Sequence, residues 1–224
     1  MTTLLDRKAI DTLRKSIPGE EFDYQLLMDA LRGYVRPRSK VTSLLTAGDL
    51  LRVKKGIYIF GPRHRRRPYS REILANLLYG PSCLSLDYAL HRHGLIPEKV
   101  ETLTSVTPGR ARTFSTGVGV FTYSRVPLGV YRLGVARLEL EGGQGFLMAT
   151  PERALADKVV QDRGLSVASR KEMEDYLLKN LRLDVDRLRG MDPDIIELFG
   201  KRCGSRKLRF LGAVVRRLKG LNHE

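Results

Sequence analysis

The sequence predicts an α+β protein, in which an N-terminal winged helix-turn-helix precedes a mixed α/β C-terminal domain that ends in a helical segment. Residues 1–60 contain three helical apolar patterns followed by two short β-prone runs. Thr, Val, Tyr and Phe alternate between Gly and Pro turns at 100–148, which favours strands, and helical periodicity returns at 151–219. We therefore expect a winged helix-turn-helix domain at 1–68 and a second domain at 69–224.

The N-terminal region contains start and stop signals for three helices. The first helix has an apolar stripe formed by Leu4, Leu5, Ile10 and Leu13. Asp23 can cap a second helix, which we expect to run to about Arg32 with Gly33 as its stop. Pro37 suits the first turn of a third helix, because the missing proline N–H would be unbonded there in any case, and this helix should end near Ala47.

The strands and later helices follow from local signals of the same kind. Residues 50–53 and 57–60 flank a Lys-Lys-Gly turn, which predicts a hairpin. Ser85 can cap a short helix that Gly94 ends, and Thr150 can cap a longer one. Further helices are expected near 70–78, 151–162, 168–180, 193–200 and 205–219.

The positive charge is concentrated in two blocks. The formal net charge is +15, with twelve Lys and Arg and one acid at 32–71, and eight Lys and Arg and no acid at 201–219. Such cations attract phosphate, acidic protein or an anionic membrane. Because there is no 18-residue apolar segment and no signal-peptide pattern, we expect a cytoplasmic protein with no membrane contact. Cys83 and Cys203 lie far apart and predict two free thiols.

The third helix is the best candidate for reading DNA, since Val41, Leu44 and Leu45 would face the core. The opposite face should then carry Arg36, Arg38, Ser39, Lys40, Thr42 and Ser43. The hairpin supplies candidates for phosphate or the minor groove, namely Arg52, Lys54 and Lys55. The segment after it should follow the adjacent backbone with Arg63, Arg65, Arg66 and Arg67. The alternatives are a solvated basic face without a partner, or a domain that binds protein or RNA.

The C-terminal block predicts an amphipathic helix with its apolar stripe at Leu208, Leu211, Val215 and Leu218. Outside the stripe lies a second basic face formed by Arg206, Lys207, Arg209, Arg216, Arg217 and Lys219. Three interpretations remain open: the helix packs on the core and offers charge to DNA, it docks on an acidic partner, or it lies on a membrane.

The sequence contains little that indicates catalysis. It has no phosphate-binding glycine loop, no G-x-S-x-G and no H-E-x-x-H. His91 and His93 point apart on a helix, and Glu152 and Asp157 lie about 140° apart around one. We therefore expect no catalytic residue, no metal and no cofactor. A nuclease-like enzyme acting on nucleic acid and a protein-interaction module are the alternative functions.

Three segments resemble the AbiEi-type antitoxins of abortive-infection type IV toxin–antitoxin pairs. They are LLRVKKGIY at 50–58, SCLSLDYAL with HGL at 82–95, and ATPERALAD at 149–157. From the first to the last they span about half of the chain, in the order and spacing of the family. The sequence departs by having Asp87 where the family often has Glu, Tyr88 for Ser and Arg153 for Lys.

This resemblance implies two roles. The winged helix would bind operator DNA with inverted repeats upstream of its operon and repress transcription. The C-terminal region would counteract a cognate nucleotidyltransferase-like toxin, functionally and not necessarily by stable binding. In the two C-terminal motifs, Ser85 and Thr150 would cap helices, and Leu86, Leu90 and Leu155 would pack.

Overall fold

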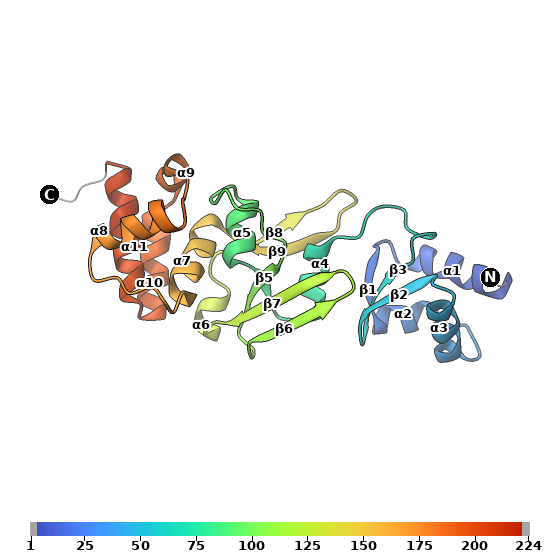
Figure 1. Cartoon of the computed structure of the whole chain (residues 1–224). Coiled ribbons are helices and arrows are strands. Elements are labelled where there is room, and N and C mark those ends of the chain that lie inside the picture. The colour runs from blue at the N-terminus through green and yellow to red at the C-terminus, as the bar shows by residue number, and fades with distance from the viewer. Residues whose placement is uncertain (1–3, 221–224) are drawn as a thin grey trace. The chain divides into compact units, whose positions relative to one another are not determined.

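Two units make up the chain in the computed structural model, which describes residues 4–220 (Figure 1). The first unit is Met1–Tyr79 with Thr116–Val118, and the second is Gly80–Ser115 with Gly119–Glu224. Residues 69–79 thus belong to the first unit, whereas the sequence assigns them to the second. Helices and strands occur in both units, so the chain has the expected α+β class.

The first unit contains a three-stranded antiparallel sheet in the order β1-β3-β2. Phe22 of β1 faces Tyr58 of β3 across the sheet, and Arg52 of β2 faces the same tyrosine from the other side. The elements are α1 (Leu4–Ser16), β1 (Glu21–Asp23), α2 (Tyr24–Ala30), α3 (Pro37–Thr46), β2 (Leu50–Lys54), β3 (Ile57–Phe60) and α4 (Arg71–Leu78).

Local sequence signals explain most of these boundaries. The Asp23 carboxylate accepts a 2.8 Å hydrogen bond from the Leu26 amide and caps α2, as expected. Pro37 occupies the first turn of α3. α2 ends at Ala30, so the expected extension to Arg32 is wrong, and Gly33 does not adopt the left-handed conformation of a helix stop. The sequence also misses β1, which is three residues long and depends on its pairing with β3.

The core of the first unit lies between the three helices and the sheet. Ile10 and Leu13 of α1 are buried there with Leu44 of α3, Phe22 of β1 and Phe60 of β3. The side chains of Leu4 and Leu5, which complete the stripe expected on α1, lie outside the described residues. Burial of one face of α3 against this core leaves its other face on the surface.

The second unit is built on a mixed six-stranded sheet in the order β6-β7-β5-β4-β9-β8. β5 pairs with β7, and β4 with β9, in parallel; β4 pairs with β5, and β8 with β9, antiparallel. The strands are β4 (Cys83–Leu84), β5 (Leu103–Thr107), β6 (Arg112–Thr116), β7 (Gly119–Arg125), β8 (Val135–Glu139) and β9 (Gly145–Ala149).

Helices follow the sheet in the C-terminal part of this unit, where α7, α8, α10 and α11 gather (Figure 1). The helices are α5 (Leu86–Arg92), α6 (Leu128–Tyr131), α7 (Pro151–Gln161), α8 (Arg170–Asp175), a π-helical turn η1 (Tyr176–Asn180), α9 (Val185–Gly190), α10 (Pro193–Cys203) and α11 (Arg206–Leu218). No helix within residues 4–220 is long and apolar enough to cross a membrane.

The expected caps of the second unit have mixed outcomes. The Thr150 hydroxyl accepts from the Arg153 amide and caps α7, as predicted. Gly94 has a φ of +67° and follows the end of α5, also as predicted. The cap expected from Ser85 is wrong, because its hydroxyl donates instead to Asp157, 72 residues further along the chain.

Candidate nucleic-acid interface

The exposed face of α3 is the centre of the candidate interface. Val41 and Leu44 are buried and Leu45 is half-buried, as the sequence predicts. Four of the predicted residues are exposed, namely Arg36, Arg38, Ser39 and Thr42, while Lys40 and Ser43 are half-buried beside them. The Thr42 hydroxyl donates to the Arg38 carbonyl at 3.2 Å within the helix. This face therefore presents arginine and hydroxyl groups, which can donate to base edges.

The start of α3 adds an apolar side chain that the sequence does not single out. Val35 lies in the turn between α2 and α3 and is 98% exposed. It lines a shallow hollow together with Tyr34, Arg36, Ser39 and Lys40. An exposed apolar group beside arginines can contact a thymine methyl in the major groove. No sequence signal distinguishes this valine from one in the core; only its exposure does.

Two lysines of the hairpin that are adjacent in sequence, Lys54 and Lys55, differ in exposure and in hydrogen bonding. Lys55 is exposed at the turn before Gly56, which has a φ of +90°. Lys54 is half-buried, and its ammonium donates to the Leu78 carbonyl at 3.0 Å, at the C-terminal end of α4. A cation at this end of a helix is favourable because the helix dipole is negative there. Lys54 therefore has a structural contact, whereas Lys55 and the exposed Arg52 present their charges to solvent.

The arginines after the hairpin also differ in exposure and in their contacts with the rest of the unit. Arg63 is exposed. Arg65 donates to the Phe60 carbonyl at 2.9 Å and lies 4.8 Å from the centre of the Tyr69 ring. The guanidinium of Arg66 donates to the Arg14 carbonyl at 3.3 Å. These contacts hold the segment against the unit, while Arg63 and Arg66 remain exposed.

Three buried acids hold the segment in place. The Glu20 carboxylate accepts from Arg14 at 2.5 Å and from the Arg66 amide at 3.1 Å. Glu21 accepts from the Ser70 amide, and burial raises its pKa while that hydrogen bond and Arg67 oppose the rise. Asp49 Oδ1 lies 2.7 Å from His64 Nε2. These three acids thus face inward and are engaged within the unit.

Gly61 allows the segment to start so close to the core. A Cβ at this position would lie 2.0 Å from the Gly48 carbonyl oxygen, so a larger residue does not fit without moving the backbone. The Gly61 amide also donates to the Asp49 carbonyl at 2.8 Å. The segment 61–70 is therefore fixed at its first residue and again at Ser70.

In the second basic face, on α11, three of the six basic residues have partners within the unit. Arg206, Arg209 and Lys219 are exposed. The other three residues have partners inside the unit: Lys207 donates to the Asp162 carbonyl at 2.8 Å, Arg216 pairs with Asp194 and Glu197, and Arg217 pairs with Glu174. Leu208, Leu211 and Val215 are buried and Leu218 is half-buried, which agrees with the expected apolar stripe. The structure therefore supports packing of this helix on the core of its own unit.

The two C-terminal motifs meet at a buried arginine. Arg153 is fully buried, and its Nε donates to Asp157 Oδ2 at 2.7 Å. The Ser85 hydroxyl donates to the same oxygen at 2.7 Å. Arg153 Nη1 donates to three carbonyl oxygens at and after α6, those of Val130, Tyr131 and Leu133. Burial raises the pKa of Asp157, and Arg153 and Ser85 oppose the rise.

Other residues of the second unit that the sequence offers as candidates for catalysis or metal binding also form structural contacts. Lys158 pairs with Asp87 at 2.7 Å, and His93 Nε2 lies 2.8 Å from the Ala149 carbonyl oxygen, so both link the same two motifs. Glu152 accepts from the Asp192 amide at 3.3 Å and does not share the partners of Asp157. Within the described part of the chain, no three His, Cys, Asp or Glu side chains gather as a metal site.

The fold is similar to that of the RV2827C protein from Mycobacterium tuberculosis. The superposition covers 100% of this chain and 83% of that protein, with a TM-score of 0.61 and 16% sequence identity. At this identity the likeness concerns the fold alone. No family model matches the sequence, and no curated protein matches it either.

The similarity extends over both units of the chain. Sequence reasoning placed Arg38 of α3 and Lys55 of the hairpin tip on the surface, where the structure has them, whereas Lys40 is half-buried. It missed the exposure of Val35, the hydrogen bonds of Lys54, Arg65 and Arg66 to backbone carbonyls, and the hydrogen-bond network around Arg153. No sequence signal marks Glu20 and Glu21 as buried, because glutamate is ordinarily exposed unless it is paired.

Proposed function

We propose that this chain is a DNA-binding transcriptional autorepressor and antitoxin that acts in the cytoplasm, with a winged helix-turn-helix as its first unit. The observation that carries the proposal is the order α1-β1-α2-α3-β2-β3 together with a sheet ordered β1-β3-β2. In a winged helix, the third helix enters the major groove and the hairpin touches the adjacent backbone. The exposed cations of α3 and the hairpin tip support this assignment.

The proposed readout assigns different tasks to different side chains. Arg38 and Ser39 lie in the first turn of α3 and Thr42 lies one turn further on; these are the candidates for base edges, with Arg38 suited to guanine. Arg52, Lys55 and Arg63 are the candidates for phosphates. Lys54, Arg65 and Arg66 chiefly hold the unit together. The proposed operator carries inverted repeats, as the family resemblance implies.

The antitoxin role rests on the resemblance of the segments 50–58, 82–95 and 149–157 to AbiEi-type antitoxins. The proposed target is a cognate nucleotidyltransferase-like toxin, counteracted functionally and not necessarily through a stable complex. The contacts of Arg153 and Ser85 with Asp157 support a structural role for the two C-terminal motifs. We therefore propose no enzymatic activity for this chain.

Fluorescence anisotropy tests the repressor role. The full chain is titrated into a labelled duplex from upstream of its own reading frame and into a shuffled duplex of the same length. We expect nanomolar-range binding to the first and much weaker binding to the second. If about six phosphates are neutralised, log K falls with log salt at a slope of roughly −5. Equal affinity for both duplexes contradicts a sequence-specific repressor.

Three variants test the assignment of side chains. Arg38→Ala should weaken binding to the upstream duplex more than to the shuffled one, because it removes a base contact. Lys55→Ala should weaken both alike, because it removes a phosphate contact. Arg132→Ala, an exposed arginine of the second unit, is the control with the same charge change. The reverse order for Arg38 and Lys55 would mean that α3 does not read the bases.

Co-expression tests the antitoxin role. The neighbouring reading frame is expressed with and without this chain, and growth is followed. We expect that frame to encode a G-S motif followed by D-x-D, to arrest growth alone, and to be tolerated with the antitoxin. Arg38→Ala in the same assay separates protection from repression, because toxin and antitoxin are driven from unrelated promoters. Growth arrest that the chain leaves unchanged refutes this part of the proposal.

A further inference from the structure

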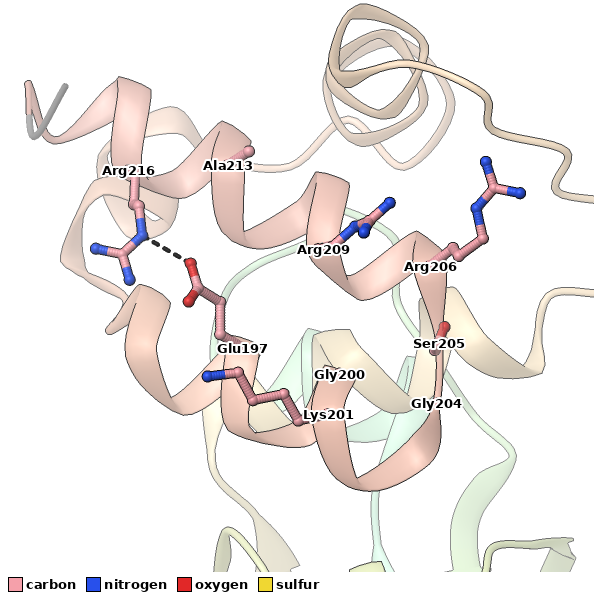
Figure 2. A pocket seen from close by; sticks show the side chains of 9 residues that line it. All are labelled: Glu197, Gly200, Lys201, Gly204, Ser205, Arg206, Arg209, Ala213 and Arg216. Atoms are coloured by element: carbon pink, nitrogen blue, oxygen red, sulfur yellow. Dashed lines mark hydrogen bonds and ion pairs between the residues drawn. The ribbon is translucent and has the colours of Figure 1, made fainter. Parts of the chain in front are cut away.

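Two open hollows flank α11 in the second unit. The first, of about 630 Å³, lies between α10 and α11 and is lined by residues that include Lys201, Arg206 and Arg209. Figure 2 shows the Arg216–Glu197 pair at one end of this hollow and Arg206 at the other. The second hollow lies between α8 and α11. Ala213 lines both, so α11 forms a low ridge between them.

The charges around the ridge are unbalanced after internal pairing. Arg216 pairs with Asp194 and Glu197, and Arg217 pairs with Glu174, so that two arginines meet three acids. With Lys201, Arg206 and Arg209 included, these eight side chains carry five positive and three negative charges. Lys201, Arg206 and Arg209 are exposed and form no ion pair with any residue of the described chain.

The spacing of these cations suits a repeating anion. Arg206 and Arg209 lie three residues apart on α11, which places neighbouring side chains about 5–6 Å apart on one face. Ala213 and Arg216 continue the same stripe along the first hollow. A single small anion would occupy one end of such a stripe. A chain of phosphates can contact Arg206 and Arg209 together, at the end of the stripe away from the Arg216–Glu197 pair.

The second hollow adds an aromatic surface. It is lined by Phe210 from α11 and by Arg170 and Lys171 from α8, with Phe210 half-buried. Basic grooves that carry an accessible aromatic ring are typical of proteins that bind single-stranded nucleic acid, because bases stack on the ring while cations follow the backbone. An acidic peptide would use the cations but would not use the ring in this way.

We propose that the ridge of α11, with Lys201, Arg206, Arg209 and Phe210 as its main contacts, is a second nucleic-acid surface that binds a single strand through its phosphates. The surface is separate from the face of α3 and does not depend on operator recognition. It belongs wholly to the second unit.

Anisotropy with labelled single-stranded RNA and DNA of mixed sequence tests the proposal. Every protein in this experiment carries Arg36→Ala, Arg38→Ala and Lys55→Ala, so that the first unit contributes little to strand binding. Against this background we compare Arg206→Ala/Arg209→Ala with the control Arg110→Ala/Arg112→Ala, two exposed arginines at and before β6. Far-UV circular dichroism confirms that each variant is folded.

Loss of two phosphate contacts should weaken strand binding roughly tenfold or more at about 100 mM salt, and make the log–log salt slope shallower by about 1.4. Phe210→Leu should weaken binding with little change of slope, because stacking is not ionic. The control pair should change neither. Strand affinity that is the same in the test and control pairs overturns the proposal, as does binding only to poly-glutamate or to anionic vesicles. Failure of operator binding alone would affect the proposed function and not this surface.

Discussion

Arg153→Met should destabilise the second unit strongly. Arg153 is fully buried and supplies a charge-assisted hydrogen bond to Asp157 and further hydrogen bonds to carbonyl oxygens of Val130, Tyr131 and Leu133. Removing one partner of a buried ion pair typically costs about 3–5 kcal/mol, because the other charge stays buried and unpaired. Methionine fills most of the space but donates no hydrogen bond, so we expect a loss in this range at neutral pH.

The loss should depend on pH. Without Arg153, only the Ser85 hydrogen bond opposes burial, so the pKa of Asp157 in the folded chain rises further above the value in the unfolded chain. Between these two pKa values the folded chain keeps a proton that the unfolded chain releases, so stability falls as the pH rises through that window. The deficit of Arg153→Met relative to the natural chain should therefore be larger at pH 8 than at pH 5.

Urea unfolding followed by far-UV circular dichroism measures the deficit, and hydrogen exchange of α7 amides assigns it to the second unit. The double variant Arg153→Met/Asp157→Leu is the matched control. It should recover the part of the loss that comes from the unpaired carboxylate, and keep the part that comes from the carbonyl oxygens. A loss under about 1 kcal/mol, or an equal loss at both pH values, would refute a structural role for this ion pair.

Three further predictions concern other parts of the chain. Lys54→Ala should lower the stability of the first unit by about 1 kcal/mol through the contact with the Leu78 carbonyl, while Lys55→Ala should leave it unchanged in the same urea titration. Cys83 is buried and burial raises its thiol pKa to about 12, so a thiol reagent at pH 8 should modify Cys203 alone until the chain is unfolded; fast modification of both would contradict the burial. Asp23→Ala should cost about 1 kcal/mol through loss of the α2 cap, with the exposed Asp11→Ala as its control.

Local signals predicted the elements whose causes are themselves local. Asp23, Pro37 and Thr150 start helices as expected, because a cap or a first-turn proline acts within three or four residues. Ser85 shows where such reasoning fails. As a cap its hydroxyl would accept from a nearby backbone amide, but it donates instead to the Asp157 carboxylate, a partner 72 residues away that local sequence does not reveal.

In the candidate surfaces, too, the sequence predicts features with a local cause and does not predict features that depend on distant segments. Periodicity placed the face of α3 correctly, since burial of Val41 and Leu44 decides which side is exposed. It could not separate Arg206 and Arg209 from Arg216 and Arg217, because the acids that engage the latter pair lie on other helices. Nor could it separate Lys54 from Lys55, whose difference depends on the position of α4. Ion pairs and hydrogen bonds between segments that are distant in sequence are therefore the contacts that sequence patterns do not predict.

The anchoring of residues 61–70 has a consequence for the thermodynamics of association. A loose arginine-rich tail loses conformational freedom when it meets a polyanion, at a cost of about 0.5–1.5 kcal/mol for each side chain that becomes ordered. Here Arg65 and Arg66 are ordered during folding by Phe60, Tyr69 and Arg14. The first unit is preorganised in this region, so little of its electrostatic attraction to a partner is spent on ordering the protein itself.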